Sequence, residues 1–241
     1  MSGKSIFYSA LVLTAGIIGA ALIFTNTWKQ NSQANQTIQV TGSAKRLLTS
    51  DQGVVRATLF VDRATQLAAF KSWQEQQPQL RIFLEEAGFA AKDIKLRPPF
   101  NYPIYNYNQN GERTSIQAYV YEMGIEVFST DIQKIETLSL ALSGLIEKGI
   151  QINAIQPEYY YSGLADLKIE IQAEAAKDAM ERAERIAAST GRKLGPLTGA
   201  RMGVLQITPP NTNIISDYGM NDASSIEKEI TAVVSGTFLI K

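Results

Sequence analysis

The sequence predicts an α+β protein that is preceded by an N-terminal transmembrane helix, and three observations support this prediction. Residues 54–161 alternate between strand-like and helix-like patterns in the order strand–helix–strand–strand–helix–strand. This is the order of the ferredoxin-like βαββαβ unit, an antiparallel sheet with two helices on one face. Residues 164–190 carry apolar side chains at intervals of three and four, which indicates one long helix. Residues 6–24 contain no charged side chain.

The N-terminal segment has the length of a membrane span. A helix over residues 6–24 would be about 28 Å long, close to the roughly 30 Å of a bilayer's hydrocarbon core. Residues 25–36 are polar and read as a tether. An uncleaved anchor fits this length best and predicts a single-pass protein of the cytoplasmic membrane with its globular domain in the periplasm. The alternative is a signal peptide cleaved near Gly19-Ala20-Ala21, which predicts a secreted or periplasmic protein.

The first part of the globular domain reads as two strands and a helix. A strand is predicted at 37–46 and a stronger one at 54–61, where apolar and polar residues alternate. The helix at 66–88 contains Pro78, where we expect a kink or a helix restart. Gly88 closes this helix.

A long hairpin and a second helix follow. A strand beginning at Ile94 runs into a tyrosine-rich segment, and Asn110-Gly111 marks the tip of the hairpin. The return strand spans 115–129. Asp131 is the predicted N-cap of a helix over 132–148, which Gly149 ends, and the next strand is predicted at 150–161.

The long helix is predicted to start after the N-cap Ser162 and to end before Gly191. Its predicted buried stripe consists of Leu167, Ile171, Ala175, Ala179 and Ala183, widened by Ala176, Met180, Ile186 and Ala187. Strands at 197–208 and 229–240 enclose a polar loop at 209–225. We therefore expect a tether and anchor at 1–36 and one domain at 37–241. Within it, a ferredoxin-like subunit at 54–161 is inserted into an outer subunit made of 37–53 and 162–241.

The composition limits the possible functions. Lysine plus arginine equals aspartate plus glutamate, 23 of each, so the chain has no overall field that would attract nucleic acid. Histidine and cysteine are absent, which excludes Ser-His-Asp and Cys-His sites, thiolate redox chemistry and the usual zinc sites. The loop from Asp217 to Asp222 has too few carboxylates for a typical calcium site. Carboxylates, lysine, tyrosine and serine remain for acid–base work, and an enzyme that uses carboxylates and Lys168 would need two carboxylates facing one cleft, which the sequence does not place. We therefore predict no catalytic, cofactor-binding or metal-binding residue and no enzyme activity.

A set of residues around the start of the long helix resembles the SIMPL domain family (DUF541) of bacterial exported proteins. The residues that carry the resemblance are Val40-Thr41-Gly42-Ser43, Tyr159, Tyr161, Ser162, Leu164, Lys168, Ala175, Ala176, Asp178, Ala179, Arg182, Ala183, Gly191, Leu194, Gly195 and Ser224-Ser225-Ile226. Ser50-Asp51 stands where family members often have Pro-Asp. The resemblance implies an envelope location, self-association and a link to oxidative-stress defence. It implies no catalytic residue.

Tyrosines form the most visible candidate site. The candidates for an interface or a pocket are Tyr102, Tyr105, Tyr107, Tyr159, Tyr161 and Lys168. Cross-strand aromatic pairing and an ion pair of Lys168 would explain them structurally. A homo-oligomer or protein-partner interface is the functional alternative, because tyrosine is enriched at interfaces. We predict a non-enzymatic envelope protein that acts by self-assembly or partner binding. The alternative is a small-molecule module with a tyrosine-lined pocket beside the long helix.

Overall fold

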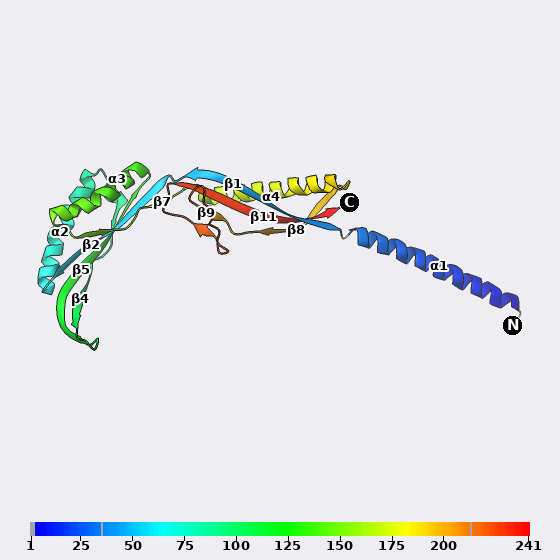
Figure 1. Cartoon of the computed structure of the whole chain (residues 1–241), viewed down its shortest axis with the longest axis horizontal. Helices are drawn as coiled ribbons and strands as arrows, with labels where there is room; N and C mark the ends of the chain where they lie inside the picture. The colour runs from blue at the N-terminus through cyan, green and yellow to red at the C-terminus, as the bar shows by residue number, and fades with distance from the viewer. Residues whose placement is uncertain (1–2, 35, 213) are drawn as a thin grey trace.

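The computed structural model describes residues 3–34, 36–212 and 214–241, except for the side chains of residues 3–10, 12 and 29–34. These residues form a mixed α+β fold with four α-helices and two β-sheets, which confirms the predicted class. Figure 1 shows an elongated molecule in which α1 (Gly3–Ala34) projects from one end and the two sheets follow one another. We call the sheet next to α1 the stem sheet and the other the head sheet.

Within the described residues, the head sheet has six strands, all paired antiparallel. Its order is β3-β5-β2-β6, with β4 also paired to β5 and β7 to β2. Helices α2 and α3 both pack against β2 and β5, and Figure 1 shows them on one side of the sheet. The elements are β2 (Gln52–Arg63), α2 (Gln66–Glu86), η1 (Ala91–Asp93), β3 (Ile94–Leu96), β4 (Phe100–Tyr107), β5 (Arg113–Ser129), α3 (Ile132–Leu142), η2 (Ser143–Lys148), β6 (Ile152–Ala154) and β7 (Glu158–Tyr160).

The head core lies between this sheet and its two helices. Alternate residues of β2 point toward the helices, as expected for a strand with one covered face. Buried side chains of this core include Val55, Ala57, Leu59, Leu80, Leu84, Met123, Ile125, Val127, Ile135, Leu138 and Leu142. Among the described elements, no helix covers the opposite face of the head sheet (Figure 1).

The stem sheet is built from both ends of the globular part. Its order is β1-β11-β9-β10, and β8 also pairs with β11. Helix α4 packs on β1 and β11. The elements are β1 (Thr37–Thr49), α4 (Leu164–Ser189), β8 (Leu194–Met202), β9 (Gln206–Thr208), β10 (Met220–Asn221) and β11 (Glu227–Ile240).

Helix α4 approaches β1 unusually closely at Gly42. A Cβ atom at this position would overlap the backbone nitrogen of Ala179 and the carbonyl oxygen of Ala175. This contact explains why the buried stripe of α4 is largely alanine. The five stripe residues predicted from Leu167 to Ala183 are buried, and so is Ala187.

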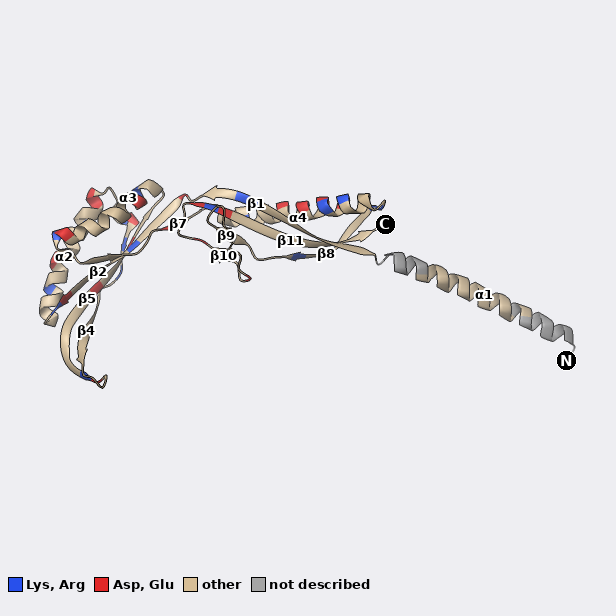
Figure 2. Cartoon of the chain, viewed as in Figure 1, with Lys and Arg blue, Asp and Glu red and all other residues tan. Residues whose placement is uncertain are grey.

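The predicted widening of that stripe is otherwise wrong. Ala176, Met180 and Ile186 are exposed, because α4 meets the sheet along a narrow line over β1 and β11. Charged side chains of both signs follow one another along the exposed side of α4 (Figure 2). Arg46 on β1 pairs with two of the acids, with 2.7 Å from its Nη1 to Oε2 of Glu170 and a contact to Glu174.

The head and stem are joined by strands. Only Ser50 and Asp51 separate β1 in the stem from β2 in the head, and the chain returns from β7 through residues 161–163 into α4. Ser162 does not cap α4 as predicted. Gly163 occupies the N-cap position, and Ser162 instead donates hydrogen bonds to the carboxylate of Asp51.

Several predicted elements differ in detail. Helix α2 continues through Pro78 without a restart, and the side-chain amide of Gln79 donates to the carbonyl of Glu75 at 3.1 Å beside it. The predicted helix at 132–148 is α-helical only to Leu142 and continues as the 3-10 helix η2. Two predicted strands are each divided in two. The strand at 150–161 becomes β6 and β7, and the strand at 197–208 becomes β8 and β9.

The predicted membrane segment lies within α1. The backbone is helical through residues 6–24, but the side chains of residues 6–10 and 12 lie outside the described residues. In the described part of the chain, no helix combines the length and the apolar character needed to cross a membrane.

Candidate functional site

The six predicted site residues lie in two separate places. Tyr102, Tyr105 and Tyr107 are on β4, in the hairpin that projects from the head (Figure 1). Tyr159 and Tyr161 lie where the head meets the stem, and Lys168 is one turn into α4. A single site formed by all six is therefore not present.

The hairpin tyrosines are held by neighbouring polar groups. The hydroxyl of Tyr102 donates to Oε1 of Glu122 at 2.8 Å, and this hydrogen bond, aided by burial, raises the pKa of Tyr102. The guanidinium carbon of Arg113 lies 4.6 Å from the ring centre of Tyr105. Tyr107 is exposed near the tip.

The tip of the hairpin is closed by Asn108, whose Oδ1 accepts hydrogen bonds from the amides of Asn110 and Glu112 at 2.9 Å each, with Gly111 at φ +79°. The predicted hairpin is confirmed.

One face of the hairpin is apolar. Phe100 and Tyr102 stack with ring centres 5.2 Å apart, and Ile104 follows on the same side of β4. The register shift after Ile104 inserts an extra residue in β5, so Tyr105 and its partner Ile116 lie on the other face, where Arg113 covers the ring of Tyr105. Phe100, Tyr102 and Ile104 form what we call the hairpin surface. It lies on the side of the sheet away from α2 and α3, and Phe100 and Ile104 are exposed.

The tyrosines where the head meets the stem are held by core packing and by a hydrogen bond. Tyr159 is buried in the head core, and Tyr161 packs against the stem core. The hydroxyl of Tyr160 donates to Glu158, whose Oε2 also lies 2.5 Å from Nη1 of Arg56. The hydrogen bond from Tyr160, followed by that from Arg56, holds the pKa of Glu158 below its usual value. Lys168 is half-buried and has no hydrogen bond or ion pair within the described residues.

The predicted tyrosine-lined pocket is too small for a metabolite. The cavity between Tyr159, Tyr160, Tyr161 and the start of α4 measures about 40 Å³. Pockets for small molecules are typically about 300–1,000 Å³. At this size the cavity has no room for the small molecule of the alternative hypothesis.

A buried ion pair borders the same cavity, and the sequence reasoning missed it. Lys228 is 3% exposed, and its Nζ donates to the carbonyl of Asp222 at 2.7 Å and lies 3.6 Å from its Oδ2. Burial lowers the pKa of Lys228, and Asp222 offsets this only in part. Burial acts to raise the pKa of Asp222, but hydrogen bonds from Ser224 and Ser225 and the charge of Lys228 bring it below its usual value. Lys228 is two residues before Ile230 on β11, so both lie on the same face of the strand. This spacing was the sequence signal for the burial of Lys228.

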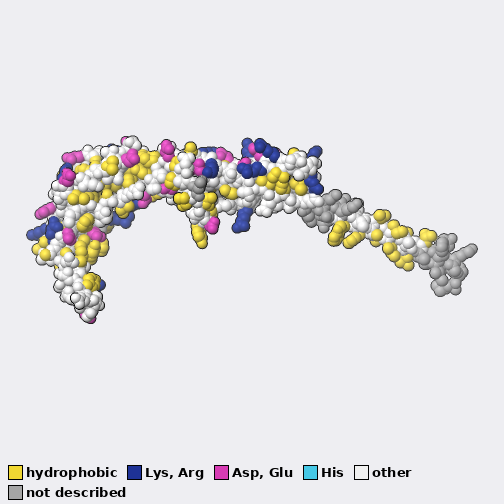
Figure 3. Space-filling view, in the orientation of Figure 1, with side chains coloured by type: hydrophobic (Ala, Val, Ile, Leu, Met, Phe, Trp, Pro, Cys, Tyr) yellow, Lys and Arg dark blue, Asp and Glu magenta, His cyan; other side chains and the backbone are white. Residues whose placement is uncertain are grey.

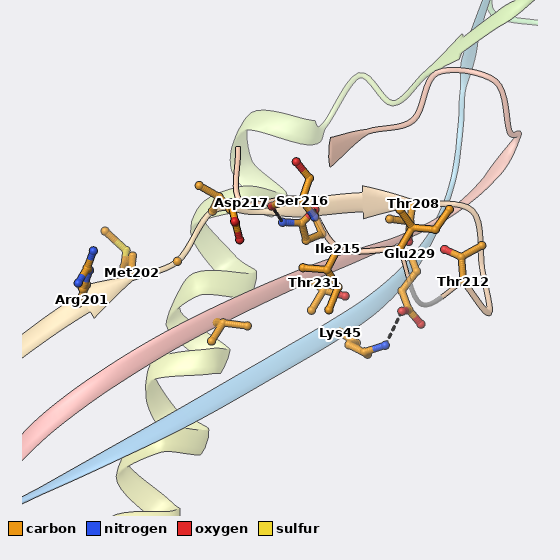
Figure 4. Close-up of a pocket in the computed structure, with 15 residues that line it drawn as sticks. Lys45, Arg201, Met202, Thr208, Thr212, Ile215, Ser216, Asp217, Glu229 and Thr231 are labelled. Atoms are coloured by element: carbon orange, nitrogen blue, oxygen red, sulfur yellow. Dashed lines mark hydrogen bonds and ion pairs between the residues drawn. The ribbon is translucent and has the colours of Figure 1, made fainter. Parts of the chain in front are cut away.

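A much larger cavity, of about 660 Å³, lies on the stem. It is formed between the face of the stem sheet opposite α4 and the loop that precedes β10 (Figure 4). No sequence prediction placed a site here. Among the described residues, no group of three or more carboxylates is arranged to hold a metal ion.

The comparisons with known proteins assign the family. Residues 38–238 match the SIMPL family, described as a protein of unknown function (DUF541). The chain therefore belongs to the SIMPL family, as the sequence resemblance indicated. No curated protein sequence matches it.

One solved structure with similarity is the ligand-free regulatory subunit of aspartate kinase from Thermus thermophilus. It is 16% identical, with 81% of this chain and 88% of that chain covered, and the TM-score is 0.16. A TM-score this low carries no argument about fold or function.

Proposed function

We propose that this chain is a non-enzymatic envelope protein that acts by self-assembly or by binding a protein partner. The observation that carries the proposal is the hairpin surface, which exposes Phe100 and Ile104 on a projecting hairpin. Exposed apolar side chains grouped on one face are typical of interaction sites. Tyr102 adds an aromatic ring with a polar end, which suits an interface.

The assembly can be tested by light scattering on the full chain in lipid nanodiscs, with Phe100→Ser and Ile104→Ser combined. We expect the native chain to form an oligomer at micromolar concentrations and this variant to dissociate. Leu140→Ser is the matched control, because Leu140 is 80% exposed on α3, on the covered side of the head. A native chain that stays monomeric, and captures no protein partner through the hairpin surface in cross-linking, would rule out the proposal.

We further propose that α1 anchors the protein in the cytoplasmic membrane, with the globular part in the periplasm. The uncharged segment 6–24 and the exposed apolar side chains Leu13, Ile17 and Leu22 support this. Extraction of membranes with alkaline carbonate should leave the full chain in the pellet. Recovery of the chain in the supernatant would favour the alternative, a secreted or periplasmic protein released by signal cleavage.

The physiological role that we propose is defence against oxidative stress, which rests on family resemblance. Deletion of the gene should increase sensitivity to peroxide, and the full chain should restore resistance. The combined Phe100→Ser and Ile104→Ser variant should not restore it. If deletion left the sensitivity to peroxide unchanged, this role would be rejected, but the result would not count against the proposed assembly.

We also propose to regard residues 54–161 as a ferredoxin-like subunit inserted between 37–53 and 162–241. The strand order β6-β2-β5-β3, antiparallel throughout, supports this view, with one helix after β2 and another after β5.

A further inference from the structure

The large cavity on the stem has a sheet as its floor. Thr231, Val233 and Glu229 alternate along β11 and share the face opposite α4. Gln206 and Thr208 on β9 pair with Thr231 and Glu229, so they lie on the same face. The volume of about 660 Å³ is within the range of small-molecule pockets.

The wall of the cavity is a loop that is fixed to the floor. Gln206 is buried, and its Nε2 donates to the carbonyl of Ser216 at 2.7 Å. The amide of Ser216 donates back to Oε1 of Gln206 at 3.4 Å. Thr212 donates to the carbonyl of Pro209 at 3.0 Å, which closes the loop on itself. The cavity is thus a formed feature of the fold.

Several apolar side chains that line the cavity are exposed. Ile215 is 81% exposed and Ile214 is 58% exposed on the loop, and Met202 and Val204 are exposed at the opposite rim. Figure 3 shows the underside of the stem with hydrophobic side chains on the part that projects there. Covering these side chains with an aliphatic group would remove apolar surface from water.

The charges are distributed unevenly along the cavity. At one end, Nζ of Lys45 lies 2.7 Å from Oε1 of Glu229, so the opposite charges of these two side chains compensate each other. Arg201 lies at the other end in Figure 4, and within the described residues its guanidinium has no hydrogen bond or ion-pair partner. Asp217 lies on the loop and would repel an anion placed beside it. The favoured position for a negative group is therefore next to Arg201.

We propose that this cavity binds a single-chain amphiphile with an anionic head group, a carboxylate or a phosphate. The head group lies against Arg201, and the aliphatic chain lies between Val233 on the floor and Ile215 on the loop. A guanidinium suits either head group, because its donors match both anions. This site is separate from the hairpin surface, and the proposal does not depend on assembly.

The chain's lack of cysteine allows a site-specific test. Met202→Cys, labelled with an environment-sensitive fluorophore, reports on the cavity in the full chain in nanodiscs. Lys193→Cys, labelled in the same way before the other end of β8, is the control for partitioning into lipid. The probes are sodium octanoate, octyl phosphate and octanol.

We expect both anions to give a saturable fluorescence change at position 202 and none at position 193, with octanol at least about tenfold weaker. Arg201→Gln should weaken the anions about tenfold and leave octanol unchanged, because one charge-assisted contact is lost. Stronger binding of only one anion would identify its head group as the natural one. Equal binding of octanoate and octanol, or no effect of Arg201→Gln, would overturn the proposal.

A second measurement covers the case in which the label itself blocks the cavity. Hydrogen exchange of the unlabelled chain should slow in residues 214–219 when octanoate is added, and Arg201→Gln should abolish this protection. Exchange that octanoate leaves unchanged in the native chain would reject the site.

Discussion

The carboxylate of Asp51 accepts two hydrogen bonds from Ser162, one from its amide at 2.8 Å and one from its hydroxyl. The two residues are far apart in the sequence, but both lie at the point where the stem meets the head. The amide of Asp51 also donates to the carbonyl of Tyr160 at 2.9 Å, and that of Ser50 to Ile226 at 2.9 Å. Asp51 therefore links the strand that leaves the stem to the segment that returns to it.

We predict that Asp51→Asn and Ser162→Ala each lower the free energy of unfolding by about 1–2 kcal/mol, because each removes hydrogen bonds to a charged group. The double variant should lose less than the sum of the two, with a coupling of about 1 kcal/mol. Urea unfolding of the four proteins measures this cycle. Strict additivity would show that the two side chains do not stabilise each other in solution.

Gly42→Ala should destabilise the stem severely, by about 3 kcal/mol or more, since the new methyl group meets the backbone of α4 at Ala175 and Ala179. The backbone of a packed helix cannot move aside as a flexible side chain can. Gly199→Ala is the control, because the nearest atom to its added Cβ is 3.9 Å away. Thermal unfolding followed by circular dichroism should show a large loss for the first variant and little for the second.

Lys228 should give the chain a stability that increases with pH. Burial lowers its pKa in the folded state, so the unfolded state binds more protons between that value and the ordinary lysine pKa of about 10.4. Lys228 should therefore make the free energy of unfolding larger as the pH rises through this interval. Lys228→Met removes this contribution, and Lys168→Met is the control. Urea unfolding at pH 7 and pH 9.5 compares the three proteins.

An equal pH dependence of the native chain and Lys228→Met would contradict the burial of a charged lysine. The comparison of variants is needed because the raised pKa values of Tyr159 and Tyr160 act in the opposite direction. For those groups the stability is complete below the unfolded tyrosine pKa of about 10 and is lost above it.

The loop beside the stem cavity should open when its anchor is removed. Gln206→Met keeps the size of the side chain but loses both hydrogen bonds to Ser216. We expect hydrogen exchange in residues 214–219 to accelerate about 5- to 30-fold, the equivalent of about 1–2 kcal/mol. Gln39→Met, on the exposed part of β1, should leave this exchange unchanged. Equal rates in the native chain and Gln206→Met would mean that other contacts hold the loop.

Much of the fold followed from local patterns in the sequence. The stripe from Leu167 to Ala183 predicted both α4 and its buried face, and Asn110-Gly111 predicted the hairpin tip, because these signals depend on neighbouring residues. The partner of Ser162 could not be predicted in this way, since Asp51 is distant in sequence. Ser162 donates its hydrogen bonds to Asp51 and therefore does not cap α4. The exposure of Met180 likewise depends on where α4 crosses the sheet.

The sites were less predictable than the fold. Tyrosine content drew attention to Tyr159 and Tyr161, which turn out to pack in two different cores. The stem cavity arises because a long loop turns back over the sheet, and its anchor, Gln206, has no local signature. Arg201 becomes notable only when its lack of a partner among the described residues is seen.

The near-continuous path from β1 into β2 has a mechanical consequence. A pull between α1 and the head would pass along the backbone of these two strands, with only Ser50 and Asp51 between them. The tension would run through covalent bonds and would not have to cross the hydrogen bonds between β1 and β11. The stem could therefore transmit force from its N-terminal helix to the head while its own sheet remains intact.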